Sequence, residues 1–415
     1  MKLMIKQKLT IFSALLVLVP FTLSALIIVA VVKSNIDSQS AQSVEKDARV
    51  AEQLYKNREL FIVQVVQNAA QTIAAQGLLD LAQAPQGASG ATIRIQGEGS
   101  KRLNGLLKAA MQASNIDFII VTDSRGNVIG SLSEASNEDS LKDNPLLVAL
   151  QNGATANKLE AQSSSVRESA EALKVLAGEK FSQQAIVEGE GKKITEGLVI
   201  EAGAPITSNN NKLLGIVLAG SLINHAPQDK AIVEDIKNKL YPSLRDYAGI
   251  SISVDDIIVS TNLPIQQDGG IGKKINGNLA DAPKAGSESF NAEIYKTAYT
   301  PIKDINKKVI GRIGVQVKQS WFNAILYYVI GVIVCIVIFF LLVAIAVAIY
   351  SAQQFTRPII ELTQVANEIS LGTLDKSIRV NSEDEIGKLA DALERMRISL
   401  VQALEKLRAK RQQGK

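Results

Sequence analysis

Two long, uninterrupted apolar runs divide the chain. They span residues 9–32 and 324–349, and neither contains a charged residue. Each is longer than the about 20 residues with which an α-helix crosses the hydrocarbon core of a bilayer. The pattern therefore predicts two transmembrane helices, with both termini on one side of a membrane and the large middle part of the chain on the other.

Basic residues beside the runs predict their orientation. Lys2, Lys6 and Lys8 precede the first run, and Arg357 follows the second. Because Lys and Arg are enriched in cytoplasmic segments, residues 1–8 and the C-terminal part are expected in the cytoplasm and the middle part outside it. The alternative for the first run is a cleaved signal peptide, but its apolar core is too long and no small-x-small cleavage site follows it.

A long helix is expected after the first run. From Ser34 to about Gln83 the chain has no proline, and apolar residues recur at helical intervals among polar ones. Glycines and prolines between positions 77 and 90 then indicate a loop. We assign residues 33–90 to this extracytoplasmic helix and its end.

The exported part then repeats one local sequence pattern. A β-prone segment with Pro205 leads, after ten residues, to Gly215 in a second such segment, and Pro301 leads to Gly311 at the same spacing. Each pair predicts a hairpin, because a proline at the end of a strand costs no ladder hydrogen bond and the polar link can reverse the chain.

Each predicted hairpin has another strand pair upstream. These pairs lie at 118–131 and 250–261, and helices are expected over 144–151 and 166–177. The pattern predicts an α+β fold with two antiparallel-sheet modules, over residues 91–228 and 229–319, the first farther from the membrane than the second.

At these residues the exported part resembles the double Cache sensor domain. The resemblance rests on the Asp123-x-x-Gly126 turn, on the two Pro-Ile hairpins and on a last strand that leads directly into the second apolar run. It implies two PAS-like modules on one long N-terminal helix, with a small-molecule ligand in the exported domain.

Four residues are candidates for ligand contact. Tyr295, Thr297 and Tyr299 alternate along one predicted strand and so share a face, where core packing is the competing role. Arg167 follows three serines and is a candidate partner for a ligand carboxylate, with plain solvent exposure as the alternative. The identity of the ligand is not readable from the sequence.

The segment after the second run has a different period. Apolar residues spaced three and four apart over 359–369 and 386–407 predict two coiled-coil helices, and Ser382 with Glu385 is a capping-box pattern for the second. Residues 353–407 resemble a HAMP signal relay, which implies an all-α parallel coiled-coil bundle of two chains and hence a homodimer. The residues that match this pattern, for which the resemblance implies a signalling role, are Pro358, Leu362, Gly372, Leu374, Ile378, Glu385 and Gly387. The basic tail, 408–415, is expected to be a solvated helix end.

Composition narrows the function classes. The chain is 47% hydrophobic and 21% charged with a net charge of +4, which fits a folded exterior and gives no reason to expect nucleic acid as a partner. The single cysteine excludes an intrachain disulfide, and the single histidine argues against a histidine-rich metal site. We expect no metal and no cofactor.

No catalytic motif is present in the sequence. Gly189 and Gly191 before Lys192 lack the spacing of a phosphate-binding loop and predict a surface turn, and the cytoplasmic part has no histidine to accept a phosphoryl group. The protein is therefore not expected to be an enzyme.

The resemblances together favour a bacterial inner-membrane, multi-pass receptor with a periplasmic sensor domain. Such a receptor binds a small molecule outside and signals through the second transmembrane helix and the HAMP domain to a separate cytoplasmic or membrane protein. Two alternatives stay open: a component of a chemoreceptor or sensor histidine kinase that has lost its output domain or keeps it on another chain, and a membrane-anchored binding scaffold.

Overall fold

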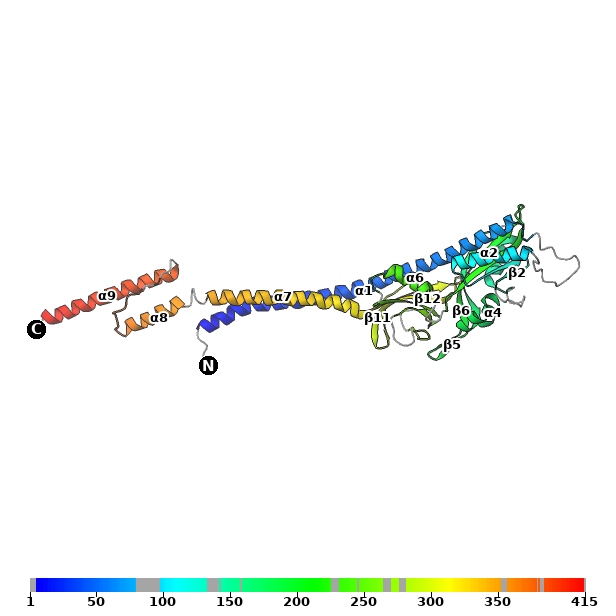
Figure 1. The fold of residues 1–415 in the computed structure, drawn as a ribbon. Coiled ribbons are helices and arrows are strands. Elements are labelled where there is room, and N and C mark those ends of the chain that lie inside the picture. The colour runs from blue at the N-terminus through cyan, green and yellow to red at the C-terminus, as the bar shows by residue number, and fades with distance from the viewer. Residues whose placement is uncertain are drawn as a thin grey trace. The chain divides into compact units, whose positions relative to one another are not determined.

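The computed structural model describes residues 5–79, 98–132, 141, 143–156, 159–224, 231–244, 246–263, 270–275, 281–351, 357–378, 380 and 384–413. Two compact units form: one comprises Asn35–Ala324, and the other comprises Met1–Ser34 together with Ile325–Lys415. Figure 1 shows the elements of both units.

The first unit contains two five-stranded antiparallel sheets with the same strand plan. The order is β2-β1-β7-β6-β3 in the first sheet and, read from the opposite edge, β9-β8-β12-β11-β10 in the second. A separate two-stranded ribbon pairs β4 (Val187–Gly189) with β5 (Lys192–Ile194). The sheets consist of β1 (Phe118–Asp123), β2 (Val128–Ser131), β3 (Gln162–Ser169), β6 (Glu196–Thr207), β7 (Leu213–Leu222), β8 (Ala248–Val254), β9 (Ile257–Thr261), β10 (Gly286–Phe290), β11 (Glu293–Lys303) and β12 (Val309–Lys318).

The repeated proline–glycine pattern of the sequence corresponds to two similar hairpins. Pro205 near the end of β6 pairs with Ile216 on β7, and Pro301 near the end of β11 pairs with Arg312 on β12. In both hairpins the register shifts one residue after the Pro-Ile dipeptide. The two sheets therefore repeat one local design, in which the bulge re-aims the chain into the polar turn.

The glycines of this pattern, Gly215 and Gly311, allow a third strand to approach each hairpin. A Cβ atom at Gly215 would lie 2.2 Å from the carbonyl oxygen of Thr122, and one at Gly311 would lie 2.6 Å from that of Ser253. Those carbonyls belong to β1 and β8, the strands that pair with β7 and β12. Glycine is thus needed because the backbone of the neighbouring strand occupies the space of a side chain.

One long helix, α1 (Ile5–Ala75), supplies the core that both sheets share. Its residues Ala48 and Ile62 are fully buried in a cluster that also holds Ile200 of the first sheet and Ile252 of the second. The helix ends before the expected Gln83. Gly77 has a φ of 58°, and its neighbour donates back to the last turn, so the left-handed residue terminates the helix.

Shorter helices cover the rest of the sheets. In the first sheet, α3 (Pro145–Thr155), α4 (Ala170–Ala177) and α5 (Glu179–Gln184) contribute to the apolar cluster on the face opposite α1. The helix α2 (Glu98–Ser114) lies against β1 and β2, and α6 (Ala231–Leu240) lies against β8.

The helix expected over 166–177 is wrong in its first part. Val166 to Ser169 belong to β3, which pairs along its length with β6. The helix begins only at Ala170, where the Ser169 hydroxyl accepts a hydrogen bond of 3.1 Å from the N–H of Ala172. Pairing with a buried neighbouring strand overrides the helical spacing of these residues.

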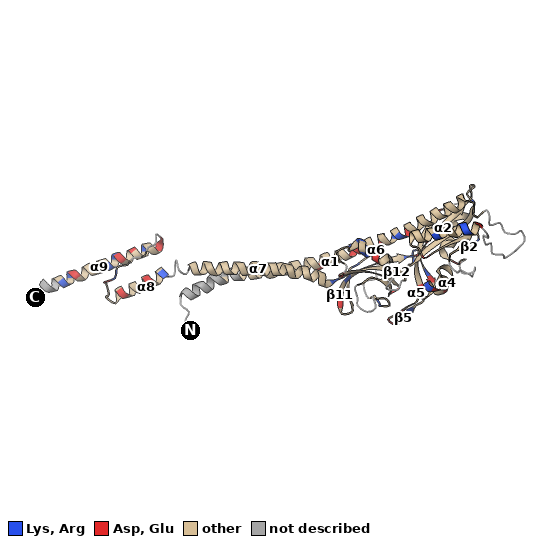
Figure 2. Ribbon diagram, viewed as in Figure 1, with Lys and Arg blue, Asp and Glu red and all other residues tan. Residues whose placement is uncertain are grey.

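The other unit holds the second apolar run and the C-terminal helices α8 (Arg357–Ser370) and α9 (Glu385–Gln413). The run lies in α7 (Gln319–Ser351), along which Figure 2 shows no charged residue. Phe21 of α1 stacks on Phe340 of α7 with ring centroids 4.9 Å apart. Among the described residues, Val19–Ala75 and Gln319–Tyr350 are long and apolar enough to cross a membrane. Both contain apolar segments that the sequence predicts as spans.

Candidate ligand-binding and relay sites

The predicted tyrosine face lies inside the second sheet. Tyr295, Thr297 and Tyr299 share one face of β11, and each is about 1% exposed. Tyr295 packs edge-on against Phe290 with ring centroids 5.7 Å apart. The two tyrosines are therefore core residues of this sheet, and direct contact with a ligand remains a prediction.

Polar groups are buried beside these tyrosines. The Tyr299 hydroxyl donates a 2.7 Å hydrogen bond to Oε2 of Glu288, and burial together with this carboxylate raises the pKa of Tyr299 well above its ordinary value. Burial raises the pKa of Tyr295 to about 12. The Thr297 hydroxyl has no hydrogen-bond partner among the described residues. Both tyrosines are therefore neutral and act as packing and hydrogen-bonding groups.

Arg167, with a side chain that is 29% exposed, is engaged in hydrogen bonds within the chain. Its Nε donates to Glu196 at 2.6 Å, and its Nη1 donates to Asp255 at 2.9 Å. Lys192 forms an ion pair with the same Asp255. Burial alone would raise the pKa of Asp255, but the two cations outweigh it and hold that pKa below its usual range. Because Asp255 lies in the β8–β9 turn, Arg167 joins the two sheets, and its contact with a ligand remains a prediction.

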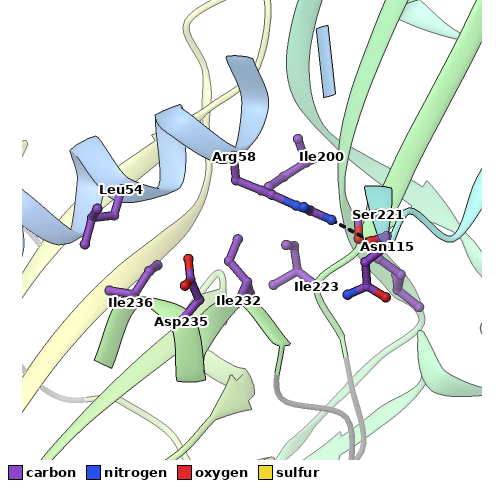
Figure 3. Close-up of a pocket in the computed structure, with 10 residues that line it drawn as sticks. Leu54, Arg58, Asn115, Ile200, Ser221, Ile223, Ile232, Asp235 and Ile236 are labelled. Atoms are coloured by element: carbon purple, nitrogen blue, oxygen red, sulfur yellow. Dashed lines mark hydrogen bonds between the residues drawn. The ribbon is translucent and has the colours of Figure 1, made fainter. Parts of the chain in front are cut away.

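A cavity lies where α1, the first sheet and α6 meet (Figure 3). Its volume is about 280 Å³. Six of its ten lining residues are aliphatic and four are polar, and two of the polar ones are charged, Arg58 on α1 and Asp235 on α6. The complete lining consists of Leu54, Arg58, Asn115, Ile200, Ser221, Leu222, Ile223, Ile232, Asp235 and Ile236.

Arg58 borders this cavity, and its guanidinium carbon lies 5.3 Å from the ring centroid of Phe61 on the same helix, a cation–π contact. Its Nη2 donates a 2.5 Å hydrogen bond to the carbonyl of Asn115, as Figure 3 shows, and no ion pair joins it to a carboxylate in the described part of the chain. Burial lowers the pKa of its guanidinium, and the more distant carboxylates of Asp117 and Asp235 partly oppose this effect. The sequence interpretation missed this site because its residues come from segments far apart along the chain.

Two buried glutamates form another cluster that the sequence interpretation missed. Glu201 on β6 is fully buried, and its Oε2 accepts 2.9 Å from the side-chain amide of Asn144. The same amide lies 3.3 Å from Oε1 of Glu168 on β3. Burial, and then the proximity of the two carboxyls, raises the pKa of Glu201, and burial is the main cause of the raised pKa of Glu168. This pair favours a protonated state.

The C-terminal helices pack around the connector between them. Leu362 and Ile369 of α8 are buried with Ile378 of the connector, and Leu374 packs against this cluster. Gly372 follows α8 with a φ of 91°, which only glycine adopts without strain. Pro358 is the second residue of α8, where its missing N–H costs no helical hydrogen bond.

The start of α9 is capped by an aspartate. Oδ1 of Asp384 accepts hydrogen bonds from the backbone N–H groups of Ile386 and Gly387, at 2.9 and 3.2 Å. Glu385 is the first residue of the helix. Ser382, expected in a capping box, lies outside the described residues.

One pair of charged residues holds the connector in place, and the sequence interpretation missed it. Glu394 of α9 accepts from the backbone N–H of Ile378 at 2.9 Å, and Arg397 donates to the carbonyl of Leu374 at 2.6 Å. Arg397 and Glu394 also pair with each other at 2.7 Å. Their spacing of three on one helix was the available signal.

Two protein families match the chain. The HAMP domain matches residues 350–402, and single cache domain 3 matches residues 224–328. The second match covers the second sheet, so the cache resemblance is confirmed there, whereas a cache identity for the first sheet remains a prediction. Neither family is enzymatic, and both imply an inner-membrane receptor with an extracellular sensor.

Individual relatives match more weakly. A putative sensory transducer protein of Acetivibrio thermocellus is 34% identical over 65 residues, which is 15% of this chain and 12% of that protein. The chain thus spans only a small part of this curated relative. The periplasmic domain of Vibrio cholerae LuxQ is 12% identical, with a TM-score of 0.39 over 67% of this chain and 99% of that one. The ligand-binding domain of the Pseudomonas fluorescens chemoreceptor CtaA, solved with L-isoleucine, is 15% identical, with a TM-score of 0.34 over 71% and 98%.

The matched domains flank α7 in the sequence. The cache match ends at residue 328, inside the helix, and the HAMP match begins at residue 350, near its end. The chain therefore contains a cache sensor domain and a HAMP domain joined by one apolar helix, the domain set of a transmembrane sensory receptor.

Proposed function

We propose that this protein is a dimeric inner-membrane receptor whose periplasmic part binds a small molecule. Binding favours one of two packings of the exterior, α7 shifts, and the HAMP helices pass the change to a cytoplasmic or membrane signalling protein. The proposed boundaries are residues 9–32 and 324–349 for the spans, 91–228 and 229–319 for two cache-like modules, and 353–407 for the relay.

The observation that carries this proposal is the direct connection between sheet and helix. β12 ends at Lys318, and α7 begins at Gln319 with no loop between them. β12 is also a central strand of the second sheet, paired with both β11 and β8. A rearrangement of that sheet would therefore act directly on the start of α7.

The energy available for such a signal is limited. A ligand can shift the balance between two states only by the difference in its affinity for them, typically about 1–3 kcal/mol. Small shifts of a packed helix are sufficient, because packed interfaces tend to have discrete arrangements.

A second copy of the chain is proposed because α9 leaves an apolar stripe uncovered. Leu389, Met396, Leu400 and Leu407 are 51%, 48%, 42% and 60% exposed in the single chain. They follow the alternating three-four spacing of a coiled-coil seam. A parallel partner helix would bury them.

We expect Leu400→Asp to abolish association of the cytoplasmic helices, because the substitution places a charge in the buried seam. Leu400 lies outside the intrachain cluster, so folding of one HAMP protomer is spared. The matched control is Ile398→Asp, at a similar 43% exposure but off the stripe. Crosslinking of the full chain in membranes measures dimerisation, and equal crosslinking of both variants would contradict the dimer.

The function itself is tested by signal transfer. Cys335 is the only cysteine, so Cys335→Ser provides a background in which Leu400→Cys reports the distance between two α9 helices by disulfide formation. The full chain in lipid nanodiscs is screened against amino acids, organic acids and polyamines. A receptor changes the crosslinking rate with at least one class. A scaffold that binds a protein or an envelope polymer shows no change with any of them.

A further inference from the structure

We propose that the cavity between α1, the first sheet and α6 binds a small apolar carboxylic acid through Arg58. The inference rests on the proposed receptor function, to which it adds a ligand class and a place. The cavity does not include the tyrosine face of β11, and its lining comes from both halves of the exterior unit.

The size of the cavity limits the ligand. About 280 Å³ corresponds to the space of roughly nine water molecules. This volume fits a molecule of a few carbon atoms with one charged group, such as a short branched-chain acid.

The aliphatic lining residues favour a ligand with an apolar part. The aliphatic lining comes from α1, β6, the segment just after β7, and α6, and includes Leu54, Ile200, Ile223, Ile232 and Ile236. Figure 3 shows Ile223, Ile232 and Ile236 on the side of the cavity opposite the stem of Arg58. Water in contact with such walls gains little hydrogen bonding, so displacing it by a branched hydrocarbon group is favourable.

Arg58 favours a ligand whose charged group is a carboxylate. Its one hydrogen bond among the described residues goes to a neutral carbonyl oxygen, and a guanidinium has five N–H donors arranged to hold a carboxylate at two points. Burial already weakens the solvation of this cation. A bound carboxylate would supply the missing counter-charge.

The neighbouring carboxylates do not fill this role. Asp235 has a side chain that is 60% exposed, and it pairs with Lys239 at 2.7 Å on its own helix. Asp117 accepts hydrogen bonds from the Ser221 hydroxyl and the Leu222 N–H, at 3.0 and 2.7 Å. Both carboxylates are held by other donors, and neither forms an ion pair with Arg58 among the described residues.

The cavity lies between elements that the proposed signal would move. Arg58 lies on the helix that carries the first apolar run, and Ile232, Asp235 and Ile236 lie on α6, which packs on β8 of the second sheet. An occupant would bridge these elements and stabilise one arrangement of them over another.

The test uses 3-methylbutanoate, its neutral amide and 3-methylbutylamine with the full chain in nanodiscs. We expect saturable thermal stabilisation by the acid and none by the amide or the amine. Arg58→Gln should weaken acid binding at least tenfold, and Arg58→Lys should weaken it less. Arg102→Gln removes an arginine that is 71% exposed on α2 and should leave binding unchanged.

A second variant protects the test against misfolding. Ile232→Phe fills the cavity without removing a charge and should also abolish the stabilisation while leaving the unliganded melting temperature close to wild type. Equal binding of acid and amide, or acid binding that survives both Arg58→Gln and Ile232→Phe, overturns the proposal.

Failure of this proposal and failure of the receptor function are distinguishable. If the acid does not bind but another compound alters Leu400→Cys crosslinking, the cavity proposal fails and the receptor function stands. If no compound alters crosslinking, the receptor function fails, whatever the result with the acid.

Discussion

Replacing Gly215 by alanine should unfold the first sheet of the exterior unit. The new methyl group would lie 2.2 Å from the carbonyl oxygen of Thr122 and 3.1 Å from the side chain of Leu79. The first clash is with backbone, so no change of rotamer relieves it, and β7 is held between β1 and β6 on both sides. We expect a loss of about 3 kcal/mol or more in the free energy of unfolding.

The matched control for this glycine lies on α2. An added Cβ at Gly105 meets nothing within 4 Å, so Gly105→Ala should raise stability by about 0.5–1 kcal/mol through its helix propensity. Thermal unfolding of the full chain in nanodiscs measures both variants. A wild-type melting temperature for Gly215→Ala would show that β1 and β7 do not pair as closely as described.

Raising the pH through the neutral range should destabilise the exterior unit. Glu201 and Glu168 have raised pKa values in the folded chain, mainly because burial disfavours their charged forms. A neighbouring carboxylate raises each pKa further, namely Glu168 for Glu201 and Glu196 for Glu168. The unfolded chain releases these protons at about pH 4.3.

The direction in which stability changes with pH follows from proton binding. Between the unfolded pKa and the raised folded pKa, the folded state binds more protons than the unfolded state. The contribution of these two carboxyl groups to stability is therefore greatest below about pH 4.3, falls as the pH rises, and stops falling above their folded pKa values. The expected slope is roughly 1 kcal/mol per pH unit for one retained proton.

Glu201→Gln tests this assignment directly. A glutamine keeps an oxygen that can accept from Asn144 but cannot ionise, so the slope across neutral pH should flatten. Glu188→Gln, at a carboxylate whose side chain is 84% exposed, should leave the slope as it is in the wild type. Melting temperatures measured over a pH series test this assignment. An unchanged slope in Glu201→Gln would show that these glutamates do not cause the loss of stability with rising pH.

The features that were readable from the sequence are those encoded by neighbouring residues. The two apolar runs and the pattern from Pro358 to Gly387 depend on spacings of a few residues, and the family matches confirm the HAMP domain and one cache domain. The Pro-Ile hairpins were also visible, because a hairpin is closed by its own turn.

Other expectations were wrong or incomplete where a distant strand decided the conformation. Val166 to Ser169 form a strand because β6 offers a pairing edge, which no local pattern reveals. The hydrogen bond of Arg167 to Asp255 was also not readable from the sequence, because Asp255 lies 88 residues further along the chain, and a ligand contact of Arg167 stays a prediction.

The sequence by itself determined the two apolar helices, the repeated hairpins and the relay pattern, because periodicity and turn chemistry act over short distances. Only the tertiary structure decided where the charges lie. It brought Glu168 and Glu201 to one amide, and it placed Arg58 at a cavity whose lining residues run from Leu54 to Ile236. Burial and counter-charge are set by which strands and helices pack together, and that packing is a property of the whole fold.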